Sequence, residues 1–235
     1  MRIAVLSLTI GEKYKQITEY GRMSKIKYCV KHNYAFHDDE DILDSTRPIA
    51  WSKIKLIQKY ISNYDYIVWM DGDTIIMNYD TNLEDFITQK MGGKDMMISQ
   101  DSCNPCTGVW FIKSSEWSEI FLRRIYMEEQ FINHPNWEQA AFIHLHKTNA
   151  TNSIKHILIL PVYEQHLFNA MWFMYQPGTF LLHFLATFRD GKDLHLQLFM
   201  NKFRSVQKED ESDFEFMSQL NWLHDGVMKW IQQSK

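Results

Sequence analysis

The segment 64–74 reads YDYIVWMDGDT, a short apolar run that ends in two carboxylates separated by one glycine. Its length and its β-branched residues predict a buried strand over residues 64–70. In open α/β sheets, ligands bind just beyond the carboxyl ends of the strands, so Asp71 and Asp73 are candidate ligand-binding residues. Two neighbouring carboxylates repel each other unless a positive group lies between them, and hard oxygen ligands favour Mg²⁺ or Mn²⁺. The alternative is a simple turn at the end of the strand, because Asp-Gly is a common turn pair.

A divalent ion at this position would have a clear use. It would neutralise a diphosphate and stabilise it as a leaving group. Gly72 would remove side-chain bulk where the ribose of a nucleotide approaches. The segment therefore predicts a metal-assisted nucleotide site, with the structural turn left open as the alternative.

Working outward from this segment, strands and helices alternate along the chain. The apolar run 3–8 predicts a first strand, and Ile17, Tyr20, Ile26 and Val30 form an apolar stripe on a helix over residues 13–31. This alternation predicts an α/β fold, a Rossmann-type αβα sandwich with a mainly parallel central sheet. Further strands are expected at 34–36, 74–77, 95–100, 108–113, 154–160 and 180–185, and further helices at 48–61, 83–89, 115–130, 136–145 and 214–232.

Composition excludes several classes of protein. The 235 residues include 25 Lys plus Arg and 29 Asp plus Glu, a net charge of −4 that argues against a nucleic-acid partner. Only three cysteines are present, too few for a disulfide framework, and Cys103 and Cys106 are expected in a loop without a function. The first residues lack the pattern of a signal peptide, so a cytoplasmic location is expected. The uncharged stretch 165–188 contains Pro177-Gly178 and predicts two buried segments around a turn, with no transmembrane segment.

Six short blocks, in this order, resemble the metal-dependent GT-A glycosyltransferases of family 34, which includes α-galactosyl-, α-mannosyl- and xylosyltransferases. The blocks are Tyr28–Tyr34, Trp51–Ile54, Trp69–Asp73, Thr107–Lys113 with the following Trp117-Ser118, Trp137–Ala141 and Leu182–Phe184. The resemblance implies one GT-A domain over residues 1–235. Its nucleotide-binding half would be 1–100, its donor-sugar and acceptor half 101–205, and its C-terminal helix 206–235.

The resemblance also implies a donor site. Asp71, Asp73 and His183 would hold Mn²⁺ or Mg²⁺ with the nucleotide diphosphate, although a lone histidine in an apolar run is more often a core residue. Lys53 would bind the donor, although most helix lysines are solvated. The other residues that it assigns to nucleotide-sugar binding are Thr9, Gly11, Tyr14, Trp69, Gly72 and Gly108, together with Arg189 or Lys192 at the diphosphate.

Three residues are the candidate catalytic groups. Glu138 would orient the hydroxyls of the donor sugar, and Gln139 would stabilise a developing oxocarbenium ion in a front-side displacement with retention. Glu138 could instead merely favour the positive end of its helix. Asp101 would face the sugar, or be a loop acid, or be the general base of an inverting variant. The chain departs from the family pattern at Cys106, where Asn is common, and at Ala186, where Gly is common, which leaves the donor sugar and the stereochemistry open.

We therefore expect an enzyme, a glycosyltransferase that moves a sugar from a nucleotide donor, UDP-linked on the family resemblance, to a hydroxyl of a glycan or glycoconjugate. A nucleotidyltransferase would also use paired carboxylates and a metal, but it usually begins with a glycine-rich loop, and residues 9–13 contain only Gly11. A non-catalytic sugar-binding domain of the same fold is the third possibility.

Overall fold

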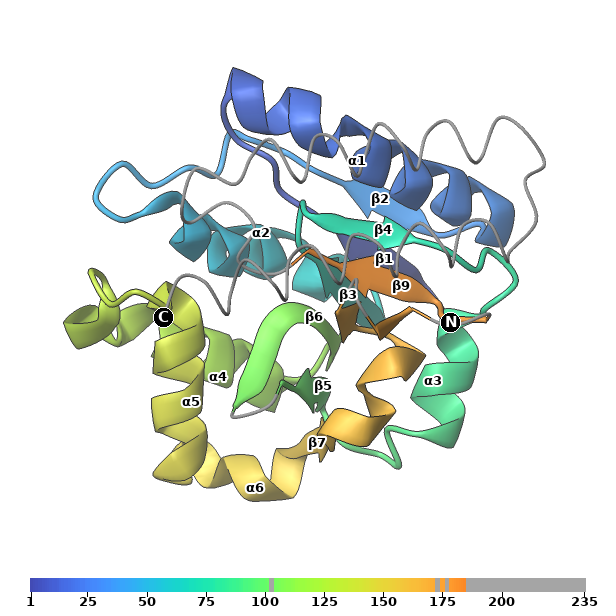
Figure 1. Ribbon diagram of the computed structural model, residues 1–235. Coiled ribbons are helices and arrows are strands. Elements are labelled where there is room, and N and C mark those ends of the chain that lie inside the picture. The colour runs from blue at the N-terminus through green and yellow to red at the C-terminus, as the bar shows by residue number, and fades with distance from the viewer. Residues whose placement is uncertain (102–103, 172–173, 176–177, 185–235) are drawn as a thin grey trace, which may run out of the picture.

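The strands form two sheets (Figure 1) in the computed structural model, which describes residues 1–101, 104–171, 174–175 and 178–184. The larger sheet has six strands in the order β2-β1-β3-β6-β5-β7, and the smaller has three in the order β4-β9-β8. The bounds are β1 Ile3–Leu6, β2 Ala35–His37, β3 Tyr66–Met70, β4 Thr74–Ile76, β5 Met96–Gln100, β6 Pro105–Lys113, β7 Ile157–Leu160, β8 Ala170–Met171 and β9 Leu181–His183.

The larger sheet is mainly parallel, as predicted. β1 pairs in parallel with β2 and with β3, and β5 pairs in parallel with β7. β6 lies between β3 and β5 and runs antiparallel to both. The short connection after β5 folds the chain back alongside that strand, which allows only the antiparallel direction. The α/β class and the αβα sandwich are therefore confirmed, with one reversed strand in the middle of the sheet.

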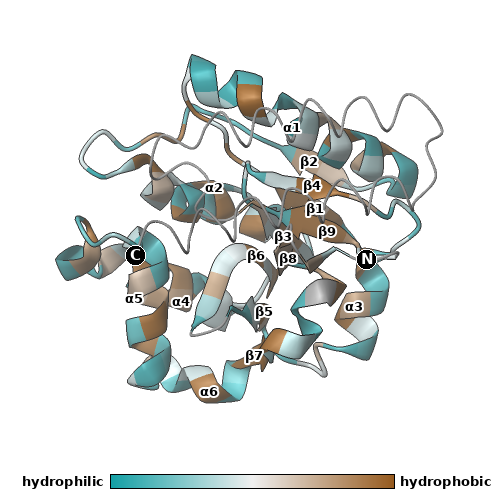
Figure 2. Ribbon diagram, in the orientation of Figure 1, coloured by the Kyte–Doolittle hydropathy of each residue, from teal (hydrophilic) through white to brown (hydrophobic). Residues whose placement is uncertain are grey.

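Helices cover both faces of the larger sheet, and alternate strand residues enter two separate cores. On β3, Ile67 and Trp69 pack in one core with α2, α4 and α5, while Val68 and Met70 pack in the other with α1 and α3. This period of two is the reason the strand is apolar throughout, since neither face meets water. Figure 2 shows brown apolar residues in the central strands and a mixture of teal and brown on the helices. The helices are α1 Glu12–His32, α2 Ser52–Tyr60, α3 Leu83–Gln89, α4 Glu116–Met127, α5 Trp137–Lys147 and α6 Ser153–His156, with short 3₁₀ turns at Ile49–Trp51, Ile61–Asn63, Glu129–Phe131, Ala150–Asn152 and Val162–Leu167.

Helix ends follow the local signals in the sequence. Asn33 ends α1 in the left-handed conformation with φ 58°, as an Asn at this position allows. Ser115 caps α4 by accepting a hydrogen bond from the backbone N–H of Ser118. Asn136 precedes α5 as expected, but its side chain makes no capping hydrogen bond there.

Three local predictions are wrong. Val30 does not belong to a buried stripe on α1, because 76% of it is exposed. Cys106 does not lie in a loop, because β6 begins at Pro105 and buries it. The strand predicted over 154–160 is shorter, because α6 occupies Ser153–His156 and β7 begins only at Ile157.

Two further predictions lie wholly or partly beyond the described residues. The helix expected over 214–232 is outside them, and the division of the chain into two halves and a C-terminal helix stays a prediction. Among the residues that the structure describes, no helix combines the length and the apolar character that crossing a membrane requires.

Candidate active site

Asp71, Asp73 and His183 meet at one point, although His183 is distant from the other two in sequence. β4 follows the two acids and pairs antiparallel with β9, with Thr74 opposite His183. His183 Nε2 lies 3.4 Å from Asp73 Oδ1 and 4.0 Å from Asp71 Oδ2. One ligand atom from each residue lies within 4.8 Å of the other two, so all three can reach a single ion.

The ring of His183 is oriented by residues behind it. Its Nδ1 lies 3.0 Å from Asn169 Oδ1, and Asn169 Nδ2 donates to Ser99 Oγ at 3.1 Å, so the amide is held at both of its ends. An amide oxygen can only accept, so Nδ1 carries a proton, and Nε2 is the nitrogen that can offer its lone pair to an ion or carry a second proton when no ion is bound. Two carboxylates and a neutral imidazole with a second hydrogen-bonded nitrogen form a donor set that suits Mn²⁺ or Mg²⁺.

Without an ion, a second proton on the His183 ring supplies positive charge between the two carboxylates. Burial disfavours the charged ring, but the carboxylate of Asp73 outweighs it and raises the pKa of His183 to about 10. Burial opposes ionisation of Asp73 as well, yet His183 and Lys25 lower the pKa of this carboxyl group. The carboxylates of this site therefore stabilise a positive charge placed between them.

Two glycines allow these groups to approach each other. A Cβ atom on Gly108 would lie 2.1 Å from Cε1 of His183, so the ring packs directly on the backbone of β6. A Cβ atom on Gly72 would lie 2.5 Å from Cγ2 of Thr9 and 3.0 Å from the hydroxyl of Tyr14. The missing side chain of Gly72 therefore makes room for the loop after β1, a reason beyond the expected approach of a ribose.

Lys53 is buried and not solvated. Its Nζ lies 2.9 Å from Asp71 Oδ1 and 2.9 Å from Glu138 Oε1, and it donates to the backbone oxygen of Thr107 at 3.0 Å. Burial acts against the ammonium, but the two carboxylates raise its pKa above the usual value. This lysine therefore holds α2, α5, β6 and the end of β3 together around one charge.

Trp69 contributes its indole N–H to the same carboxylate. Nε1 donates to Asp71 Oδ1 at 2.6 Å, beside the ammonium of Lys53. Both donors use Oδ1, and Oδ2 is the oxygen that faces His183. The arrangement divides Asp71 into a held oxygen and an oxygen directed at the ligand cluster.

Glu138 and Gln139 meet β6 through Thr107. The hydroxyl of Thr107 lies 3.1 Å from Glu138 Oε1, and its backbone N–H donates to Gln139 Oε1 at 3.1 Å. Asp101 lies in the connection between β5 and β6, where its Oδ1 accepts from the N–H of Asn104 at 2.8 Å. All three candidate catalytic residues line the same cavity as Asp71, Asp73 and His183.

Thr9 and Gly11 precede α1, whereas Tyr14 belongs to its first turn, and the three residues have different surroundings. Tyr14 lines the cavity, and burial and the charges of Asp73 and Asp71 raise the pKa of its phenol. Thr9 is buried against Gly72, and Gly11 precedes α1 with φ 90°, a conformation that favours glycine. Neither Thr9 nor Gly11 lines the cavity. Arg189 and Lys192 are outside the described residues.

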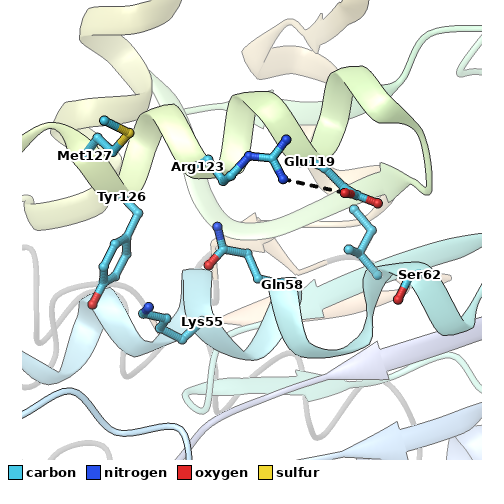
Figure 3. A pocket seen from close by; sticks show the side chains of 8 residues that line it. Lys55, Gln58, Ser62, Glu119, Arg123, Tyr126 and Met127 are labelled. Atoms are coloured by element: carbon cyan, nitrogen blue, oxygen red, sulfur yellow. Dashed lines mark ion pairs between the residues drawn. The ribbon is translucent and has the colours of Figure 1, made fainter.

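The cavity has a volume of about 730 Å³, which is within the usual range for a small-molecule site. The charged groups described above line it together with apolar residues: Leu8, Ile10, Pro48, Ile49, Ala50 and Trp137. A second cavity, of about 450 Å³, lies between α2 and α4 (Figure 3). There Arg123 is already paired with Glu119 at 3.6 Å, and Asp71, Asp73 and His183 do not line this cavity.

The sequence did not point to two residues that shape the site. Thr107 was recognisable only as part of a motif block, and Asn169 only as a polar residue inside the uncharged stretch 165–188. A polar residue that interrupts an apolar stretch was the available signal, since buried polar groups need partners. Its partners, Ser99 and His183, became visible only in the folded chain.

Part of the sequence resembles a known protein family. A sequence model of the galactosyl transferase GMA12/MNN10 family matches residues 7–92. No significant match was found among curated proteins.

Several solved structures share the fold. A glycosyltransferase involved in the glycosylation of the major capsid of PBCV-1 aligns with a TM-score of 0.69 and 15% identity, over 86% of this chain and 100% of that one. The glycosyltransferase GlyE of Streptococcus pneumoniae TIGR4 gives a TM-score of 0.56 and 14% identity, over 88% of this chain and 65% of that one. The galactosyltransferase LgtC, solved with donor and acceptor sugar analogues, gives 0.51 and 12%, over 86% and 96%.

The family match begins just after β1 and covers α1, α2, β3, the Asp-Gly-Asp turn and α3, and the likeness in fold extends over 86% of this chain. The chain is a glycosyltransferase of the GT-A fold, with sequence resemblance to the galactosyl transferase GMA12/MNN10 family.

Proposed function

We propose that this enzyme transfers a hexose or pentose from a UDP-sugar to a hydroxyl of a glycan or glycoconjugate, with Mn²⁺ or Mg²⁺ and with retention at the anomeric carbon. The observation that carries the proposal is the convergence of Asp71, Asp73 and His183 in a cavity that also contains Glu138 and Gln139. When bound, the ion would supply positive charge for the departing diphosphate.

The residues around the cluster have separate tasks in this proposal. Lys53 and Trp69 hold Asp71, so that the carboxylate needs no reorganisation when the donor binds. Tyr14 lies beside the turn, where it can contact the ribose. Lys53 and Trp69 are assigned to holding Asp71 because they already bond to it, and Tyr14 is assigned to the donor because it lines the cavity.

On the sugar side, Glu138 and Gln139 would act on the donor. The carboxamide oxygen of Gln139 is held by the N–H of Thr107, so its dipole stays fixed at the edge of the cavity and can stabilise an oxocarbenium ion. An amide is a weak nucleophile, which favours front-side displacement over a covalent intermediate. Asp101 would face the sugar, and it would be the general base if the reaction inverts.

A donor screen tests the proposal. Release of UDP or GDP from several nucleotide sugars is measured with Mn²⁺, with Mg²⁺ and with EDTA, for the wild type, Asp73→Asn and the control Asp85→Asn. Asp85 is an exposed acid on α3. We expect release by the wild type and by the control, no release with EDTA, and a loss of about 100-fold or more in Asp73→Asn, because charge stabilisation at a leaving group contributes several kcal/mol.

Other results would refute the proposal. Release of pyrophosphate from a nucleoside triphosphate and a sugar phosphate would identify a nucleotidyltransferase. Sugar binding without turnover of any donor would identify a non-catalytic domain. Equally tight UDP binding with and without EDTA would contradict the metal. NMR of the product anomer decides between retention and inversion.

A further inference from the structure

The strand that follows the two acids has an unusual neighbour. β4 is an edge strand of the smaller sheet, with β9 on one side only. An edge strand leaves a row of backbone N–H and C=O groups without a partner strand. α1 packs along this open edge (Figure 1), so the helix has to satisfy those groups with side chains.

Two side chains of α1 do so. Ser24 Oγ accepts from the N–H of Ile76 at 3.1 Å and donates its own proton to the oxygen of Gly21 at 2.7 Å. Lys25 Nζ donates to the oxygen of Thr74 at 3.0 Å and to that of Gly72 at 3.4 Å. Together these bonds reach from the Asp71–Asp73 turn to the end of β4.

The approach depends on a glycine. A Cβ atom on Gly21 would lie 2.4 Å from the oxygen of Thr74 and 3.3 Å from that of Gly72. Lys25 is fully buried and Ser24 is 3% exposed, so polar side chains and Gly21 form the face of α1 toward β4. The apolar stripe expected for this helix does not supply that face.

The buried ammonium of Lys25 is matched to its surroundings. Burial lowers its pKa to about 8, so it is still mainly charged at neutral pH, and it is attracted to the carboxylates of Asp73 and Asp71. Two backbone oxygens accept hydrogen bonds from the ammonium, which offsets the loss of its hydration on burial. The ammonium of Lys25 contacts the backbone of the turn and does not line the cavity, whereas His183 does line it.

We propose that Gly21, Ser24 and Lys25 form a polar cradle that takes the place of a neighbouring strand and holds the Asp71-Gly72-Asp73 turn in its ligand-binding geometry. Lys25 and Ser24 are positioning residues, since they act through backbone atoms and do not line the cavity. The inference rests on the proposed function for the identity of the ligand, but the hydrogen bonds to Gly72, Thr74 and Ile76 can be tested without it.

The test uses Lys25→Met, which keeps the length of the side chain but removes its donors, and Ser24→Ala, a milder change. Lys27→Met is the matched control, because Lys27 is exposed on the same helix. Mn²⁺ binding is measured by calorimetry with UDP present, and backbone amide exchange is followed over residues 72–76. We expect Lys25→Met to weaken Mn²⁺ binding about tenfold or more, as loss of an outer-shell partner does, and to speed exchange in this segment about tenfold. Ser24→Ala should speed exchange mainly at Ile76.

The direction of the change separates positioning from charge. Removing a cation near the acids should by itself tighten the binding of Mn²⁺, so weaker binding shows that geometry was lost. Unchanged Mn²⁺ affinity and unchanged exchange over 72–76, with only a lower melting temperature, would overturn the inference. If Lys25→Met does not fold, amide exchange in Ser24→Ala is the test: faster exchange at Ile76 supports the inference, and unchanged exchange overturns it. If the wild type binds no divalent ion, the proposed function fails, and the exchange data alone decide whether the cradle exists.

Discussion

At the scale of single residues, the two oxygens of Asp71 have different partners. Oδ1 accepts from Trp69 and Lys53, and Oδ2 faces His183. A carboxylate held in this way keeps one oxygen aimed at the ion position before anything binds. Preorganisation of this kind is worth more inside a protein than in water, because the local dielectric constant is low.

Replacing Trp69 with Phe should weaken Mn²⁺ binding about 10-fold to 100-fold, because an outer-shell hydrogen bond to a ligand is lost. Trp110→Phe is the matched control. Trp110 lies opposite Trp69 on β6, and its Nε1 has no hydrogen-bond partner among the described residues. Titration of Mn²⁺ in both variants separates the lost hydrogen bond from the lost volume. Equal affinities in the two variants would show that Trp69 has no orienting role.

The high pKa of His183 predicts how metal binding depends on pH. The metal-free ring is protonated up to about pH 10, and the ion requires the neutral ring, so binding should release one proton and strengthen with rising pH. We expect up to about a tenfold gain in affinity per pH unit as the pH rises toward 10, and no further gain from this group above it. Calorimetry in buffers of different ionisation enthalpy counts the released proton, and His183→Gln should release none.

The same shift has an opposite consequence for the metal-free fold. The pKa of His183 is higher in the folded chain than in the unfolded one, so its contribution to stability is complete below about pH 6.5 and is lost as the pH rises toward 10.

At the scale of elements, the site depends on how closely β6 and β9 approach. His183 on β9 packs its ring against the backbone of Gly108 on β6. The sequence showed Gly108 in a motif block and suggested a role in nucleotide binding. The structure gives a packing reason that no pattern within one segment could reveal, because the ring comes from a strand far along the chain.

Gly108→Ala should therefore displace His183. The new methyl group would lie 2.1 Å from the ring, and overpacking of this kind costs about 1–3 kcal/mol of unfolding free energy. Denaturation of Gly108→Ala, His183→Ala and the double variant forms a cycle. We expect Gly108→Ala to cost almost nothing once the ring is gone. A cost that persists without the ring would contradict the packing explanation.

At the scale of the whole molecule, the ion position joins the two sheets. Asp71 and Asp73 follow β3 of the larger sheet, and His183 ends β9 of the smaller one. A ligand that binds all three residues binds only the folded chain, so it stabilises the fold by mass action.

Mn²⁺ with UDP should accordingly raise the melting temperature. A ligand at one hundred times its dissociation constant adds about 2.7 kcal/mol, which corresponds to roughly 5–10 °C for a domain of this size. Differential scanning calorimetry should show the shift in the wild type and in Asp85→Asn, and no shift with EDTA or in Asp73→Asn. A shift that survives EDTA would place UDP in a site without the metal.

The sequence by itself determined the order of the strands and helices, the α/β class and the carboxylates at the end of β3, because these follow from local periodicity and from residues adjacent in the chain. The order of the motif blocks along the sequence also suggested His183 and Lys53 as residues of the site. Only the tertiary structure decided that Lys53 is buried between Asp71 and Glu138, that Asn169 orients His183, and that α1 faces β4 with polar side chains. Those contacts join segments that are distant in the sequence, and their geometry depends on strand pairing and helix packing that no single segment encodes.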